Sequence, residues 1–218
     1  MKLFVYDHCP YCVRARMPFG FKGIDLELVT LLNDDLDTPV SMIGEKMVPI
    51  LEKDDGTWMP ESLDIIAYID GNFGGEPALA EAAEREDLAA WLSDANDVMR
   101  RLTMPRWVQA PIAEFATRGA IDYFTHAKEE TIGPFGEQLE ATDALKGELT
   151  RALQKLAPMI ESPRAVSGTL SYDDIRLFGH LRGVTIFKGA EYPPSVRAYL
   201  ETMAELSGVP LYDDIAIA

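Results

Sequence analysis

The chain has 218 residues, of which 36 are acidic and 20 are basic, and its formal net charge is -16. The length suits one large or two small domains, and a content of 47% apolar and 26% charged residues is ordinary for a soluble globular protein. So negative a chain repels phosphate backbones and anionic lipid, which disfavours nucleic-acid and membrane-surface binding. Two cysteines are too few for a disulfide-stapled secreted domain or a four-cysteine zinc site. Without a signal peptide or an apolar run of roughly 18 residues, we expect a cytoplasmic protein.

The first seventy residues have the pattern of a mixed α/β domain. A short apolar run at residues 3–6 predicts a buried strand, and a helix should follow from Pro10 to about Lys22. Pro18 should kink that helix or shift its end. Alternation over residues 24–32 predicts a second strand, and residues 33–44 have room for one short helix. The turn sequence Asp54-Asp55-Gly56 predicts a hairpin, and a further helix should begin near Ser62.

The pattern becomes helical after the turn-rich residues 71–77. One long helix is predicted by apolar residues at spacings of three and four, namely Leu88, Trp91, Leu92, Ala95, Met99 and Leu102. Leucines between 139 and 156 predict another helix, and Ser171 followed by Asp174 resembles a capping box. We therefore expect an α/β domain at residues 1–72, a linker at 73–83 and an all-helical domain at 84–218.

The strongest chemical motif is Cys9-Pro10-Tyr11-Cys12 at the start of a predicted helix. Unpaired N–H groups and the helix dipole should stabilise a thiolate at Cys9, making it nucleophilic. Cys12 follows about one turn later, close enough to attack a disulfide formed at Cys9. The spacing therefore predicts thiol–disulfide exchange.

Other roles for the cysteines fit less well. A structural disulfide would close only four residues and would be unusual in a reducing cytosol. Zinc would need further ligands from His8, His126 or His180, and we expect no metal site; haem attachment would need histidine at position 13, which is valine. We expect His8 to be an exposed loop residue. Arg14 and Arg16 either hold an anionic substrate or lie on a solvated helix face.

With this dithiol, Lys46-Met47-Val48-Pro49-Ile50 and Met59-Pro60-Glu61-Ser62, the sequence resembles glutaredoxins, and more narrowly the bacterial glutaredoxin 2 family. The resemblance runs along the whole chain. It implies a thioredoxin-like glutaredoxin domain followed by a helical domain like that of glutathione transferases. It also implies a monomer that uses glutathione as a co-substrate, with no tightly bound cofactor.

Residue by residue, the resemblance implies that Cys9 is the nucleophile and Cys12 the resolving thiol. It assigns glutathione binding to Cys9, Tyr11, Val48, Pro49, Glu61 and Ser62. Pro49 matches the family's cis-proline, and the Val48 backbone should pair with the peptide part of glutathione. Glu61 and Ser62 should bind the γ-glutamyl end, although a plain helix start would explain them too. Lys46 either meets the glycyl carboxylate or is a surface residue.

Three functions are compatible with this sequence. The first is a glutathione-dependent oxidoreductase that reduces protein disulfides and glutathionylated proteins. The second is a cysteine-type glutathione transferase, which would have no use for Cys12. The third is a non-catalytic binding protein on the same fold, which would need no dithiol at all. The intact motif favours the first.

Overall fold

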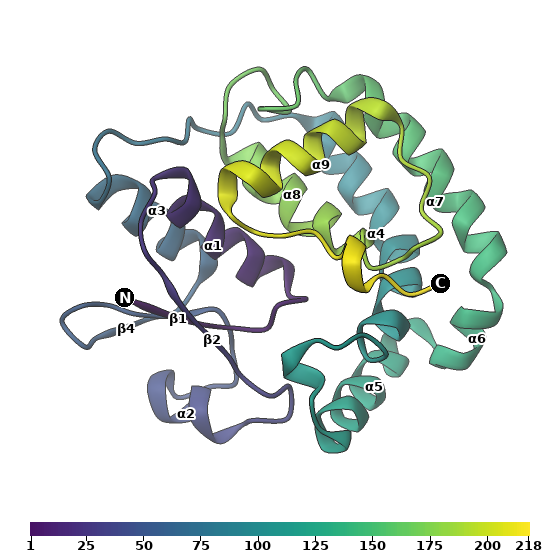
Figure 1. Ribbon diagram of the computed structural model, residues 1–218, viewed down its shortest axis with the longest axis horizontal. Helices are drawn as coiled ribbons and strands as arrows, with labels where there is room; N and C mark the ends of the chain where they lie inside the picture. The colour runs from purple at the N-terminus through teal and green to yellow at the C-terminus, as the bar shows by residue number, and fades with distance from the viewer.

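The computed structural model describes residues 1–218 and contains one four-stranded sheet surrounded by helices (Figure 1). The strands are β1 (Lys2–Val5), β2 (Glu27–Thr30), β3 (Ile50–Glu52) and β4 (Trp58–Met59), in the spatial order β2-β1-β3-β4. The pairing of β1 with β2 is parallel, whereas the β1–β3 and β3–β4 pairings are antiparallel. Together with the helices α1 (Pro10–Phe21), α2 (Asp37–Ile43) and α3 (Ser62–Asn72), this is the predicted thioredoxin-like arrangement.

Every longer element after Asn72 is a helix, as predicted. These are α4 (Glu86–Trp107), α5 (Arg118–Ile132), α6 (Phe135–Glu140), α7 (Thr142–Leu156), α8 (Tyr172–Val184) and α9 (Pro194–Ser207), with short 3-10 turns η1 (Ala113–Phe115), η2 (Ala157–Met159) and η3 (Asp213–Ile215). We call β1 to α3 the N-terminal part and α4 to η3 the helical part. None of the helices combines the length and the apolar composition that crossing a membrane requires.

Helix α1 joins the two parts because it is buried on both sides. Figure 1 shows it between the sheet and the helices α8 and α9, with α3 beside it and α2 beyond the strands. Ala15 and Phe19 pack into the core under the sheet, whereas Val13 and Met17 join the core of the helical part. A helix that contributes to two cores has no solvent face broad enough to give an amphipathic pattern.

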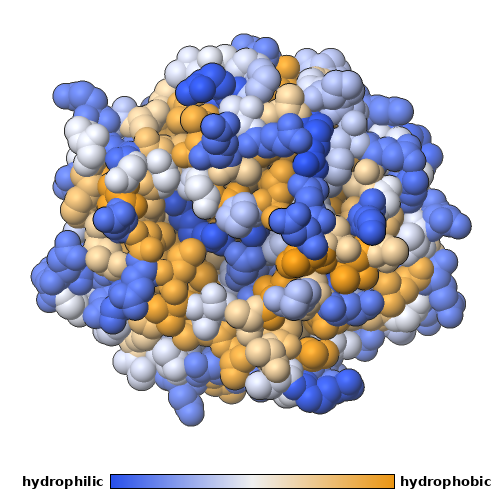
Figure 2. Space-filling view, viewed as in Figure 1, coloured by the Kyte–Doolittle hydropathy of each residue, from blue (hydrophilic) through white to orange (hydrophobic).

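The space-filling view shows how hydrophilic and hydrophobic residues are distributed over one face of the molecule (Figure 2). Hydrophilic side chains cover most of the rim of this face, and apolar patches gather nearer its middle. Only a few large apolar side chains are exposed anywhere, among them Tyr11, Leu36 and Tyr123. A surface with so few large apolar side chains agrees with the 26% of charged residues in the chain.

One predicted helix end is confirmed, and two other boundaries were wrong. Helix α1 ends at Phe21, one residue before the predicted Lys22, so Pro18 does not shift its end. The second strand is shorter than predicted because Gly23 adopts a left-handed conformation and the Ile24 N–H bonds to the Phe19 carbonyl (2.8 Å), which closes the helix. The helix predicted from the leucines after 138 is two helices, which meet at Ala141.

Candidate active site

Cys9 precedes the first turn of α1, and Cys12 lies within that turn. The Cys9 backbone is extended (φ -72°, ψ 122°), and Pro10 occupies a first-turn position where its missing N–H costs nothing. Cys9 is half-buried and Cys12 is fully buried, and both are free thiols. The Cys9 sulfur therefore lies at a helix N-terminus, where unpaired N–H groups favour an anion.

The two thiols differ strongly in acidity. A hydrogen bond from the Cys12 thiol, together with the charge of His8 and the N–H groups of the first turn, outweighs burial and lowers the pKa of Cys9 to about 6. Burial, followed by the neighbouring Cys9 sulfur, raises the pKa of Cys12 well above its usual value. Near neutral pH Cys9 is mostly thiolate and Cys12 keeps its proton. Such a pair can act as nucleophile and resolving thiol.

A cavity of about 620 Å³ borders Cys9 between the N-terminal and the helical part. The N-terminal part contributes Tyr6, His8, Cys9, Pro10, Tyr11, Asn33, Lys46, Met47 and Val48. From the helical part come residues of α4, α5 and α8 that include Met99, Arg100, Thr103, Trp107, Tyr123, Phe124, Lys128 and His180. The volume lies within the range of small-molecule sites, and apolar walls with a few polar groups are typical of them.

The charges around this cavity have one sign. Lys46, Arg100 and Lys128 line it, and no aspartate or glutamate does. Burial, and then the charge of Arg100, lower the pKa of Lys128. In a chain with a net charge of -16, the cavity is thus a local basic region that favours an anionic ligand.

The sequence-predicted site residues fall into two groups. Cys9, Tyr11 and Val48 line the cavity, and Cys12 is buried behind Cys9. The Val48–Pro49 peptide bond is cis, as the resemblance implied. This segment enters β3 directly after the cavity wall.

The remaining two predicted residues, Glu61 and Ser62, lie at the start of α3 and outside the cavity lining. Glu61 is exposed and adopts a positive φ of 68°, whereas Ser62 is buried. Glu61 is the N-cap of α3, and its side chain makes no capping hydrogen bond to the helix. The cavity that borders Cys9 therefore does not include these two residues.

The basic residues near the dithiol have distinct positions. Arg16 does not face solvent or a ligand, because it is buried and bonds to Asp7 (Nη1–Oδ1, 2.6 Å). Arg14 packs with its guanidinium 5.0 Å from the centre of the Tyr11 ring, and its Nε is buried without a partner. Lys46 lines the cavity, where its Nζ donates to the Asn33 carbonyl (2.6 Å).

Arg100 and Lys128 were not identified from the sequence. For Arg100, the spacing of polar residues along the sequence could have indicated a role in the cavity. Polar Asn96, Arg100 and Thr103 recur at spacings of four and three on α4, beside its apolar face, and all three line the cavity. Lys128 lies on α5, which the apolar spacing did not single out as a helix.

The expectation that His8 is exposed was wrong. Only 9% of its side chain is exposed, and its ring lies among Tyr6, Trp107, Phe115 and Phe124, with ring centres 4.9–5.9 Å away. Its Nδ1 lies 2.8 Å from Oε1 of Glu114, a residue more than a hundred positions later in the chain. A loop that looks exposed in sequence is covered here by the helical part.

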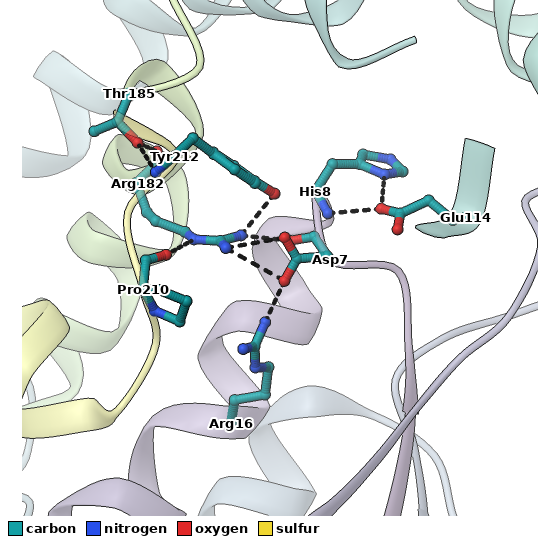
Figure 3. A network of polar contacts seen from close by, with 8 residues as sticks. All are labelled: Asp7, His8, Arg16, Glu114, Arg182, Thr185, Pro210 and Tyr212. Atoms are coloured by element: carbon teal, nitrogen blue, oxygen red, sulfur yellow. Dashed lines mark hydrogen bonds and ion pairs between the residues drawn. The ribbon is translucent and has the colours of Figure 1, made fainter. Parts of the chain in front are cut away.

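Asp7 is also bound by the helical part (Figure 3). Arg182 on α8 donates to Asp7 Oδ2 (3.0 Å), to its backbone carbonyl (2.5 Å) and to the Tyr212 hydroxyl (2.7 Å). Burial opposes ionisation of Asp7, but Arg182 and then Arg16 outweigh it and lower its pKa to about 2. The carboxylate is thus a firm link between α1 and α8.

Known proteins resemble this chain both in sequence and in structure. Residues 87–216 match the family described as "Glutaredoxin 2, C terminal domain". The chain belongs to the glutaredoxin 2 family. Residues 3–77 match the description "Glutathione S-transferase, N-terminal domain". Glutaredoxin 2 of Escherichia coli K12 is 42% identical over 217 residues, which cover 100% of both chains.

Solved structures agree with this family assignment. Glutaredoxin 2 of Salmonella typhimurium, determined in complex with glutathione, is 42% identical and superposes with a TM-score of 0.95 over 99% of this chain and 98% of its own. A glutathione S-transferase of Ceriporiopsis subvermispora is only 14% identical, with a TM-score of 0.69 over 96% of this chain and 97% of its own, and shows the shared fold alone. The predicted glutaredoxin with a transferase-like helical part is confirmed.

Proposed function

We propose that this chain is a glutathione-dependent thiol–disulfide oxidoreductase whose nucleophile is Cys9 and whose resolving thiol is Cys12. The observation that carries the proposal is the contrast between the two thiols. Cys9 borders an open cavity with its pKa lowered to about 6, chiefly by the Cys12 thiol, whereas Cys12 is buried and protonated. The similar Salmonella protein, solved with glutathione bound, supports glutathione as the co-substrate.

With a glutathionylated protein, the Cys9 thiolate attacks the glutathione sulfur of the mixed disulfide. A new disulfide joins Cys9 to glutathione, and the protein sulfur leaves as a thiolate that takes up a proton. A second glutathione thiolate then attacks the glutathione sulfur held by Cys9. Glutathione disulfide leaves, and Cys9 returns to the thiolate.

With a protein disulfide, Cys9 attacks one sulfur and the other leaves as a thiol. Cys12, once deprotonated, attacks the Cys9 sulfur of the mixed disulfide, which releases the second protein thiol and forms a Cys9–Cys12 disulfide. Two glutathione molecules reduce that disulfide and become glutathione disulfide. Only this route needs Cys12.

The binding assignment combines the lining of the cavity with the resemblance to glutaredoxins. We propose that Tyr11, Val48 and Pro49 bind the peptide part of glutathione, with Glu61 and Ser62 at its γ-glutamyl end. Lys46, Arg100 and Lys128 supply the positive charge that draws anionic glutathione toward Cys9. We further propose that the protein acts as a cytoplasmic monomer on disulfide-containing and glutathionylated proteins.

The test is a glutathione-coupled reduction assay on the wild type, Cys9→Ser and Cys12→Ser. With a glutathione mixed disulfide as substrate, Cys9→Ser should lose activity and Cys12→Ser should retain it. With a protein disulfide, both variants should fail. Because the chain has only these two cysteines, each variant is the matched control for the other. Full activity of Cys9→Ser would exclude this mechanism.

The cysteine-type transferase predicts a different outcome in the same experiment. Such an enzyme would conjugate glutathione to an electrophile at the same rate in wild type and Cys12→Ser, with little disulfide reduction in either. The hydrogen bond between the two thiols favours the oxidoreductase, since it gives Cys12 a direct role at the nucleophile.

A further inference from the structure

Glu114 is a fully buried carboxylate that reaches the dithiol loop from the helical part. It lies on η1 and is 0% exposed. Its Oε1 accepts two hydrogen bonds from His8, one from the backbone N–H (2.9 Å) and one at ring Nδ1 (2.8 Å), as Figure 3 shows. Its Oε2 is buried and has no partner. The His8 ring lines the same cavity as Cys9.

An ionised buried carboxylate needs a positive charge nearby, because burying an unpaired charge is strongly unfavourable. The His8 ring is the only basic group within ion-pair distance of Glu114. The two nearby arginines, Arg16 and Arg182, are bound to Asp7 instead. Within this structure, a proton on both nitrogens of the His8 ring would supply the missing charge.

The surroundings of the ring suit a cation. Trp107, Phe115 and Phe124 enclose it with ring centres 4.9, 5.2 and 5.0 Å away, and aromatic rings attract a positive charge through their quadrupoles. Tyr6 stacks on the remaining side at 5.9 Å. The aromatic rings and the carboxylate oxygen 2.8 Å from Nδ1 would both stabilise a positive charge on the His8 ring.

We propose that Glu114 is a positioning residue that keeps the His8 ring protonated, so that this cation supports the Cys9 thiolate next to it. This inference rests on the proposed function, because it concerns how the same nucleophile is activated. It makes the helical part a contributor to thiolate chemistry, through η1. The charge of His8 is indeed among the causes that lower the pKa of Cys9, after the Cys12 hydrogen bond and against burial.

Other titratable groups around His8 and Cys9 bear on the sign of the effect. They are Tyr6 and Asp7 on the same loop, Cys12 and Arg14 on α1, Lys46 before β3, Arg100 on α4, Tyr123 and Lys128 on α5, and His180 on α8. The exchange of Glu114 for the isosteric glutamine alters none of these residues. A glutamine oxygen can still accept both hydrogen bonds, so the exchange removes the charge and keeps the geometry.

The direction of the change distinguishes two ways in which Glu114 could act. If it acts through His8, Glu114→Gln removes the negative charge that stabilises the protonated ring, and the Cys9 thiolate becomes less stable. If it acts by its own field, the same exchange removes a negative charge and the thiolate becomes more stable. The two mechanisms therefore shift the Cys9 titration in opposite directions.

The experiment measures the pH dependence of iodoacetamide alkylation at Cys9, located by peptide mass spectrometry, in the full chain. Glu114→Gln should raise the Cys9 midpoint by about one pH unit, and His8→Gln should raise it similarly. The double variant should match His8→Gln, because Glu114 has nothing left to act through. Glu130→Gln is the matched control, since Glu130 pairs with the exposed His126 on α5 at 3.8 Å. It should leave the midpoint unchanged.

A lower midpoint in Glu114→Gln would overturn the proposal in favour of a direct field. An unchanged midpoint would overturn it too, because the charge of Glu114 would then have no effect on the Cys9 thiolate. If Glu114→Gln fails to fold by circular dichroism, His8→Gln decides alone, and no rise there refutes the proposal. Preferential alkylation of Cys12 in the wild type would instead count against the proposed function, independently of Glu114.

Discussion

Asp7 offers the sharpest test of how the two parts are joined. It lies two residues before Cys9 and is ion-paired to Arg182 on α8 and to Arg16 on α1. Replacing it by asparagine keeps the shape of the side chain and removes its charge. Both guanidinium groups, which are almost fully buried, then lose their only carboxylate.

The size of the effect follows from the titration of Asp7. Burial opposes ionisation, yet Arg182 and Arg16 lower the pKa of Asp7 from 3.8 to about 2. At about 1.4 kcal/mol for each pH unit, the ionised carboxylate stabilises the fold by about 2–3 kcal/mol. Because the folded pKa is depressed, this stabilisation is present above pH 3.8 and is lost as the pH falls toward 2. Asp7→Asn should therefore matter at neutral pH and have little effect in acid.

The assay is urea denaturation followed by tryptophan fluorescence at pH 7, 4, 3 and 2.5. We expect Asp7→Asn to lower the free energy of unfolding by about 2–3 kcal/mol at pH 7, with the difference shrinking below pH 4. Asp122→Asn is the control, since the Asp122–Arg118 pair is exposed and should contribute under about 1 kcal/mol. A loss that is the same at pH 7 and pH 2.5 would show that shape, and not charge, links the two parts here.

Three further predictions concern packing, capping and the charge of the cavity. Gly20→Ala should lower the free energy of unfolding by about 1–3 kcal/mol in thermal denaturation, because the new methyl group would overlap the Ser207 carbonyl of α9. Gly71→Ala is the control and should have no such effect, because a methyl group there would contact nothing. Equal losses of stability in the two variants would contradict the packing of α1 against α9. Ser171→Ala should cost about 1 kcal/mol, since it removes the capping box of α8, and unchanged urea denaturation would argue against that cap. Lys128→Gln should weaken glutathione binding several-fold in calorimetry at low salt and less at high salt, whereas a salt-independent loss would exclude an electrostatic role.

Local signals were enough to predict much of the fold. Three short motifs restrict the conformation of the backbone around them. They are the proline after Cys9, the Asp-Gly turn, and the serine followed three residues later by an acid. Each has the predicted role or position in the structure. The second strand was overextended because alternation continues through Ile24, whereas the glycine before it closes α1. Nothing in the alternating pattern itself distinguishes a strand from a helix cap.

The site was less predictable because its partners are distant in the chain. The positions of the two cysteines follow from one short motif. The cations on α4 and α5 line the cavity only because the helical part folds back over the dithiol. Arg16 was a candidate for binding an anionic substrate because it is basic and lies close to the dithiol in the sequence. Its true partner, Asp7, is set by the position of α8, which no local pattern reveals.

The dithiol loop shows why the two parts work as one unit. Consecutive residues of this loop, Asp7 and His8, bind Arg182 and Glu114, which lie 175 and 106 positions away in the sequence. Cys9 follows immediately, so the backbone that presents the nucleophile is held from two sides by the helical part. Without those contacts the side chains of Asp7 and His8 would face water. Exposed ion pairs contribute little to stability, and an exposed histidine needs no carboxylate partner. On the proposal for Glu114, the helical part then sets both where the thiolate sits and how readily it forms.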